Sequence, residues 1–213
     1  MEVENHKEEV PFEYYLEKYQ SLDPVETAQR LDILYDASTQ KFQLRFMGFL
    51  YEVSYPEFSI KSLEKETADK DVMMDSLSAK TFILRYLLEG QQIKSSGKFI
   101  TFREFPTYGE LYNQQFTGRC IKRLTFGFGF KLKAFSEAME CIPGVKKISM
   151  GDVAYEFELV NGYRMQFIFW EGDEEFPPSA QILYSDNFQF GFHAEDLVVA
   201  GDLSITTVKN LCR

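Results

Sequence analysis

The sequence is poor in cysteine, has no CxxC motif and contains no long apolar run, and each absence excludes a class of protein. Its three cysteines, Cys120, Cys141 and Cys212, cannot supply the four thiolates that hold an iron–sulfur cluster. We expect free thiols in a reducing compartment, with Cys120 and Cys141 buried and unreactive. No run approaches the roughly 18 apolar residues of a membrane span, and the acidic N-terminus MEVENHKEEV lacks the apolar region of a signal peptide. These absences predict a cytoplasmic protein without a membrane partner.

Basic residues are also scarce overall, and the net charge is −10. Acids dominate both ends of the chain, with 18 acids and 10 bases in residues 1–93 and 11 acids and 3 bases in residues 151–213. Residues 94–147 show the reverse balance, with 10 bases and 4 acids. The overall sign argues against nucleic acid as a partner, because its binders need a basic face. The basic middle could hold a small anion, although the simpler interpretation is that it faces the acidic ends within one fold.

The chain does contain enough apolar material for a large core. Of its 213 residues, 45% are hydrophobic and 16% are aromatic, and phenylalanine alone accounts for 21. Aromatic rings mostly contribute to burial, so a ring-filled core is favoured over an aromatic ligand pocket. No Pro-, Gly- or Ser-rich linker divides the chain, and we therefore expect one domain over residues 1–213.

Apolar side chains recur at helical spacing in several segments. This spacing predicts helices at 11–20, from Asp23-Pro24 to about Leu34, at 72–89, at the end of 97–116, at 130–140, and from Glu195 to about Leu211. The 72–89 segment is apolar nearly all round its second half, which indicates deep burial. Arg85 is the only charge between Thr81 and Leu88, and a lone buried charge is costly. Arg85 is therefore expected to have a carboxylate or carbonyl partner.

Alternating apolar and polar residues predict strands between residues 42 and 60, with Gly48 at a turn or bulge, and again at 153–170 and 180–184. Together with the helices, these strands indicate an α+β fold in which antiparallel sheet hairpins pack with helices. The order strand, strand, strand, helix is expected twice, over 42–89 and over 153–211. Residue identities do not repeat between the two segments, so two β-β-β-α halves are a hypothesis only.

The side chains of the 153–170 hairpin predict its register. A three-residue loop, Val160–Gly162, would pair Leu159 with Tyr163 and Glu158 with Arg164. The alternating apolar residues of both strands would then share one face; they are Val153, Tyr155, Phe157, Leu159, Tyr163, Met165, Phe167 and Phe169. Ile168 and Trp170 would lie on the opposite face. Trp170 and the carboxylates that follow it should therefore border one surface.

The turn after this hairpin is the strongest candidate for a site. It holds four acids within five residues, followed by Pro177-Pro178; the acids are Glu171, Asp173, Glu174 and Glu175. We expect ligand contacts from this turn and from a charged pair beside another turn; the candidate residues are Trp170, Glu171, Asp173, Glu174, Arg103 and Glu104. A divalent cation would need several such oxygens, but the acids lack the alternating spacing of a calcium loop. A solvated turn whose carboxylates meet the basic segment is the simpler interpretation.

No residues form a recognisable catalytic set. Cys120 and Cys141 have no histidine nearby in the sequence to act as a base. His193 precedes the last helix, which Glu195 and Asp196 would open because acids in a first turn favour a helix start, and a structural role for His193 is favoured over ligand contact. The glycines of TFGFGFKLK (125–133) match no phosphate-binding motif. We assign no catalytic residue, no metal ligand and no cofactor.

Several strings of residues are distinctive. They are FILRYLLEG (82–90), SGKFITFREFPTYGELY (96–112), GDVAYEFE (151–158), FWEGDEEFPPSAQILYSDN (169–187) and AEDLVVAG (194–201). These strings resemble an uncharacterised prokaryotic family known only as a domain of unknown function. Some of its members are linked to iron–sulfur and corrinoid one-carbon proteins of anaerobes, which implies an accessory role near such chemistry. This chain lacks the cysteine cluster of the fused members, has Arg85 where many relatives have histidine, and inherits no established catalytic residue from the family.

Two functional hypotheses follow. The first is a non-catalytic binding or accessory module with an unknown protein or small-molecule partner. The second is a small metal-dependent enzyme that uses the carboxylates of residues 171–175. The sequence shows no nucleophile with its base, and the first hypothesis is favoured for that reason.

Overall fold

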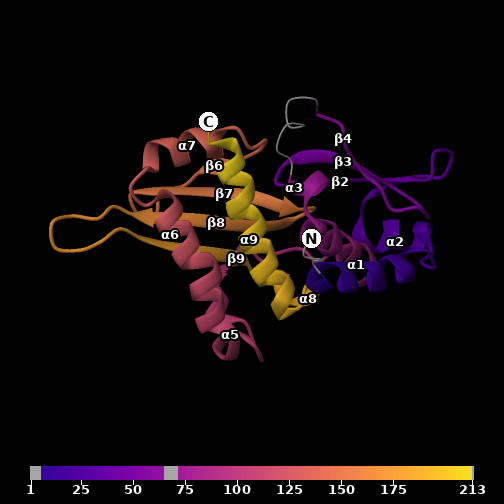
Figure 1. Ribbon diagram of the computed structural model, residues 1–213, viewed down its shortest axis with the longest axis horizontal. Helices are drawn as coiled ribbons and strands as arrows, with labels where there is room; N and C mark the ends of the chain where they lie inside the picture. The colour runs from indigo at the N-terminus through magenta and orange to yellow at the C-terminus, as the bar shows by residue number, and fades with distance from the viewer. Residues whose placement is uncertain (1–5, 65–71, 213) are drawn as a thin grey trace, which may run out of the picture.

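The computed structural model describes residues 6–64 and 72–212, and within them the chain forms one antiparallel sheet with helices packed on it (Figure 1). The strands are β1 (Leu34–Asp36), β2 (Lys41–Phe46), β3 (Phe49–Ser54), β4 (Ile60–Ser62), β5 (Phe99–Thr101), β6 (Lys146–Lys147), β7 (Val153–Val160), β8 (Tyr163–Trp170) and β9 (Ser179–Ser185). The helices are α1 (His6–Tyr19), α2 (Pro24–Leu31), α3 (Val72–Asp75), α4 (Leu77–Glu89), α5 (Gly109–Phe116), α6 (Lys122–Phe128), α7 (Leu132–Glu140), α8 (Phe188–Gly191) and α9 (Ala194–Leu211), with a 3-10 turn η2 (Phe102–Glu104) and a π-helical turn η3 (Thr117–Ile121). The predicted α+β class is confirmed. No described helix is both long and apolar enough to cross a membrane.

Two three-stranded units, β2–β4 and β7–β9, form most of the sheet and meet at their first strands, while β1, β5 and β6 pair with β2, β9 and β7. The order of the sheet is β4-β3-β2-β7-β8-β9-β5, and β2 meets β7 antiparallel through the pair Phe46–Val160. A long helix follows each unit along the chain, α4 after β4 and α9 after β9, and these two helices contact each other. The expected order strand, strand, strand, helix is therefore present in both halves. Figure 1 shows α6, α7 and α9 lying across the β7–β9 unit, while α1 packs on α4 in the other half.

The β7–β8 hairpin has the predicted register except at its turn. Glu158 pairs with Arg164, and the apolar pairs run on from Phe157–Met165 to the end of the strands. At the turn, however, Val160 pairs with Tyr163, so the predicted Leu159–Tyr163 pair is wrong. Leu159 is an extra residue in a β-bulge, which restores the alternation after a two-residue turn. The carbonyl of this extra residue accepts the Met47 N–H at 2.7 Å, and this hydrogen bond connects the two sheet units.

The helices differ from the sequence predictions in several places. The first helix, expected over 11–20, already begins at His6, and the short helix α8 was not predicted. The predicted 72–89 helix is interrupted at Ser76, whose hydroxyl accepts the Ala79 N–H and caps α4. The second helix ends at Leu31, and Leu34 already begins β1. No helix was predicted for 117–128, although η3 and α6 continue α5 there; threonine and glycine are weak helix formers, and tertiary packing decides this segment. Residues 61–71 are rich in charge and lack periodicity, which predicts a surface connection; residues 61 and 62 instead belong to β4, and 65–71 lie outside the described residues.

The three cysteines are free thiols, as predicted. Cys120 is buried against Gly201 in α9, and burial raises the pKa of its thiol to about 12. The predicted burial of Cys141 is wrong, because Cys141 is exposed. It lies at the C-terminal cap of α7, beyond the buried residues of that helix.

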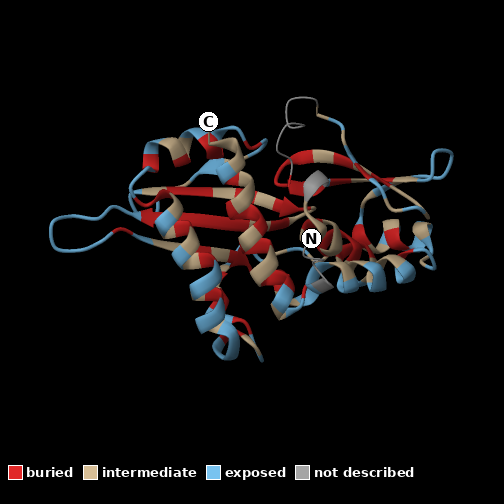
Figure 2. Ribbon diagram, viewed as in Figure 1, coloured by how far each residue is buried: buried red, intermediate tan, exposed pale blue. Residues whose placement is uncertain are grey.

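Buried side chains of both sheet units form one continuous apolar cluster, which extends from Tyr19 in α1 to Val208 in α9. Figure 2 shows the buried residues concentrated in the strands and on the helix faces that cover them.

This shared core predicts a single calorimetric transition, because neither sheet unit can unfold without exposing apolar surface of the other. Two well-separated transitions, or a stable fragment cut near residue 95 or 150, would contradict the prediction of one domain.

Candidate functional site

The acidic turn projects from the end of β8 and is open to solvent (Figure 2). Trp170, the last residue of β8, is exposed on the sheet face opposite the buried Phe169, as the predicted register requires. The Asp173 carboxylate accepts the backbone N–H groups of Phe176 and Glu175 at 2.7 and 2.8 Å. These hydrogen bonds lower the pKa of Asp173 and give the turn a defined shape. Among the described residues, no ion pair joins the acids of the turn to the basic segment.

Arg103 and Glu104 lie elsewhere, in η2 at the edge of the sheet. The Arg103 guanidinium pairs with Glu110, and the Glu104 carboxylate accepts the Thr101 N–H at 2.7 Å. Thr101 is the end of β5 and pairs with Leu183, whereas Trp170 pairs with Ser179, so the two groups meet β9 toward opposite ends. The structure therefore does not bring the six predicted site residues together.

A metal centre is not assembled by the residues that the structure describes. Over 6–64 and 72–212, no three histidine, cysteine or acidic residues lie close enough together to hold a metal ion. The hypothesis of a metal-dependent enzyme therefore gains no support from the geometry.

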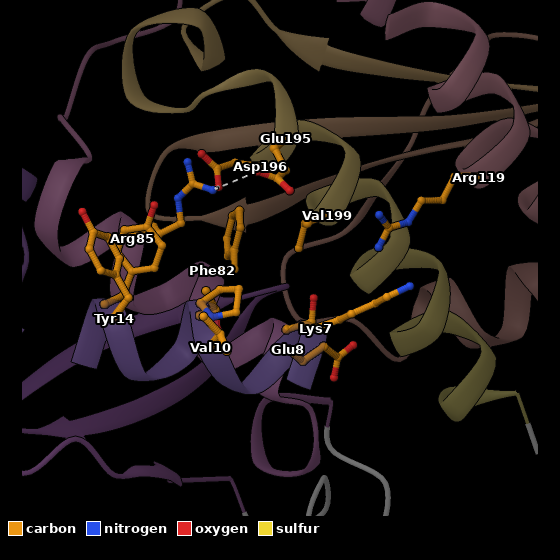
Figure 3. A pocket seen from close by; sticks show the side chains of 14 residues that line it. Lys7, Glu8, Val10, Tyr14, Phe82, Arg85, Arg119, Glu195, Asp196 and Val199 are labelled. Carbon is orange, nitrogen blue, oxygen red and sulfur yellow. Dashed lines mark ion pairs between the residues drawn. The ribbon is translucent and has the colours of Figure 1, made fainter. Parts of the chain in front are cut away.

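A cleft of about 740 Å³ lies between α1, α4 and the start of α9 (Figure 3). A second cavity of about 500 Å³ shares Arg85, Arg119 and Glu195 with it. We call the two together the arginine cleft. Its apolar walls include Phe82 and Val199. The charged residues that line it are Lys7, Glu8, Arg85, Arg119, Glu195 and Asp196.

Arg85 is the central side chain of the arginine cleft. Only 15% of its side chain is exposed, and its Nη1 lies 3.0 Å from Asp196 Oδ1 and 3.7 Å from Glu195 Oε2. Figure 3 shows the guanidinium and the Asp196 carboxylate pointing toward each other. The guanidinium carbon also lies 5.3 Å from the centre of the Tyr15 ring, a cation–π contact. The predicted carboxylate partner is thus confirmed, but among the residues that the structure describes the buried Nε of Arg85 has no hydrogen-bond partner.

Asp196 connects this ion pair to the start of α9. Its second carboxylate oxygen accepts the backbone N–H of His193, the N-cap residue, at 3.0 Å. Asp196 is buried, and burial raises the pKa of its carboxyl while Arg85 opposes the rise. His193 has the expected position before the helix, and its Nε2 lies 3.5 Å from the Glu89 carboxylate. The first turn of α9 is therefore held against α4 by charge.

Arg119 reaches the arginine cleft from the π-helical turn η3. Such turns occur frequently at functional sites because they displace side chains from the helical pattern. Arg119 is half exposed, and its Nη2 lies 3.7 Å from Asp202 in α9. One turn later, Arg123 binds Asp202 and also donates to the Thr206 hydroxyl at 2.8 Å. The interpretation that the basic middle faces an acidic end of the chain is correct at this interface.

Sequence reasoning identified Arg85 and missed the rest of the arginine cleft. Arg119 falls in the segment for which no helix was predicted, and only the basic character of 94–147 marked it. Glu195 and Asp196 were interpreted as acids that start a helix. Asp196 does have this role, but its ion pair with Arg85 was not predicted. The cleft combines residues from positions 7 to 199, and no local pattern connects them.

Comparison with curated proteins finds no match, and comparison with solved structures finds none either. A family model does match, over residues 23–207, and its description is Domain of unknown function (DUF3786). The matched part includes Arg85, Arg119 and Asp196, whereas α1, one wall of the arginine cleft, precedes it. The chain therefore belongs to the DUF3786 family, a domain whose function is unknown.

Proposed function

We propose that this protein is a non-catalytic binding module that holds a small ligand with an anionic group in the arginine cleft. The observation that carries the proposal is the buried Nε of Arg85, for which residues 6–64 and 72–212 provide no hydrogen-bond partner. A buried donor without a partner costs about 1–3 kcal/mol. A ligand oxygen that accepts from this group would remove that cost and gain a charge-assisted hydrogen bond.

The surroundings of Arg85 favour an anion that is attached to an apolar group. Arg119 adds a second guanidinium to the same cavities. The N-terminal end of α9, whose Ala194 lines the smaller cavity, presents backbone N–H groups and the positive end of the helix dipole. Phe82 and Val199 would cover an apolar part of the ligand. Glu195 is mostly exposed and is long enough to turn away into water.

The biological setting is also part of the proposal, and the family resemblance supports it. We place the module in the cytoplasm of a prokaryote, as an accessory protein near iron–sulfur and corrinoid one-carbon proteins of anaerobes. Its partner would be a protein or a small molecule, and not nucleic acid. Catalysis by the carboxylates of 171–175 is the alternative, which no contact of the described residues favours.

Benzoate and the neutral benzamide form a matched pair of probes for the arginine cleft. We expect benzoate at millimolar concentration to raise the melting temperature and benzamide to leave it unchanged, since a ligand bound only by the native state stabilises it. Arg119→Gln should weaken benzoate binding about tenfold, because one charge-assisted hydrogen bond is lost. Titration calorimetry measures the affinity.

Lys122→Gln provides the control for that substitution. Lys122 is exposed on the same helical segment but lines a different, shallow pocket, so its loss changes net charge equally without touching the arginine cleft. The proposal fails if benzoate gives no shift, or if the two variants bind it equally well.

A further inference from the structure

Several large apolar side chains are exposed on and beside the acidic turn. Phe126 at the end of α6 is 80% exposed, Phe130 just beyond it is 81% exposed, and Phe176 in the turn is 67% exposed. Trp170 at the base of the turn and Met150 are exposed as well. Single exposed apolar residues are ordinary, but a group of them on one part of a surface marks an interaction site.

Contacts between three segments bring these residues to the same end of the molecule. Pro178 at the end of the turn is buried against Gly129, where an added Cβ would lie 3.0 Å from the proline Cγ. On the other side, the Asp152 N–H donates to the Phe169 carbonyl at 2.8 Å, and the Asp152 carboxylate accepts the Glu171 N–H at 2.7 Å. The end of α6, the 150–152 loop and the turn therefore form one surface, which we call the aromatic end. In Figure 1 the turn projects from the sheet there, beside the end of α6.

The turn at the centre of the aromatic end is already ordered in the unbound protein. Asp173 accepts two backbone N–H groups within the turn, and its own N–H donates to the Phe176 carbonyl at 2.9 Å. Gly172 packs closely on Pro178, so that a Cβ there would clash with the proline ring. A surface that is already ordered loses little conformational entropy on binding.

The charge of the aromatic end indicates the chemistry of its partner. Glu171, Glu174 and Glu175 are exposed, and the described residues offer them no ion-pair partner. Lys131 follows Phe130 and the Lys209 side chain lies beside Gly127, but the four acids of the turn outnumber these two bases. We propose that the aromatic end is a docking surface for a basic segment of a partner protein that also carries apolar side chains. The rings would supply the contact area and the carboxylates would select a basic partner.

Trp170 is the only tryptophan of the chain and lies in this surface, so its fluorescence reports on occupancy directly. The probe is a synthetic helical peptide of lysine and leucine, with a peptide of glutamate and leucine as its counterpart. We expect the lysine peptide to change Trp170 emission saturably and the glutamate peptide to leave it unchanged. The combined variant Glu171→Gln/Glu174→Gln/Glu175→Gln, and separately Phe126→Ser/Phe130→Ser, should each weaken binding about tenfold.

Two controls separate this surface from other parts of the protein. Phe190→Ser removes an exposed ring on α8, and Arg119→Gln alters the arginine cleft; both should leave the emission change as it is in the parent. The proposal is overturned if the lysine peptide does not change emission up to about 1 mM, or if neither combined variant weakens its binding. It is also overturned if light scattering shows a dimer that Phe126→Ser/Phe130→Ser dissociates, since the occupant would then be a second copy.

Discussion

Replacing Arg85 with methionine is expected to lower the free energy of unfolding by about 3–5 kcal/mol at pH 7, because the buried Asp196 carboxylate loses its partner. Methionine fills a similar volume, so the loss is mainly electrostatic. The loss of the second ion pair, between Arg85 and Glu195, should add little to this change, because the Glu195 side chain is mostly exposed. Urea denaturation followed by circular dichroism measures the change.

The pH dependence of this loss distinguishes a broken ion pair from lost packing. Burial already raises the pKa of Asp196 in the folded protein, and removing Arg85 should raise it further. When the pKa of Asp196 is higher in the folded than in the unfolded state, the folded protein keeps this proton to a higher pH. The loss of unfolding free energy caused by Arg85→Met therefore grows as pH rises above the ordinary pKa range of aspartate, and it shrinks at lower pH. The double variant Arg85→Met/Asp196→Asn should recover most of the stability. A single variant as stable as the parent at pH 7 would mean that Arg85 is effectively solvated.

Replacing Phe135 with alanine is expected to cost about 3–5 kcal/mol, since a fully buried ring leaves a cavity. Phe135 lies on the face of α7 that packs against the sheet, and its side chain is fully buried. Its centroid lies 4.7 Å from that of Phe169, 5.4 Å from Phe128 and 5.9 Å from Tyr155. The change therefore removes ring contacts to one helix, α6, and to two strands, β7 and β8, and the same urea titration measures it.

Phe130→Ala is the matched control, because it removes the same ring from a neighbouring but exposed position. Its effect on stability should stay within about 0.5 kcal/mol. If both variants were destabilised equally, the aromatic end would belong to the folded core and could not be a free docking surface.

Periodicity predicted those parts of the fold in which neighbouring residues alone decide the structure. The β7–β8 register follows from alternation, since a shift by one residue would turn Phe157 and Met165 to the wrong face. Gly48 was expected at a turn or bulge, and it lies in the two-residue turn between β2 and β3 with a positive φ of 78°. The high apolar content of the 72–89 segment likewise implied that Arg85 needs a partner.

The sequence by itself thus determined the α+β class, the strands of both sheet units and the burial of α4, because these depend on patterns that repeat every two or about four residues. Tertiary structure decided the rest. Only packing made a helix of 117–128 and brought Arg119 to the same cleft as Arg85, and only the closing of α9 on α4 supplied Asp196 as the partner. It also separated Arg103 from Trp170 and gathered Phe126 and Phe130 beside the acidic turn. These contacts join residues far apart in the chain, and their formation depends on the balance of desolvation and packing in the whole fold, which no local pattern encodes.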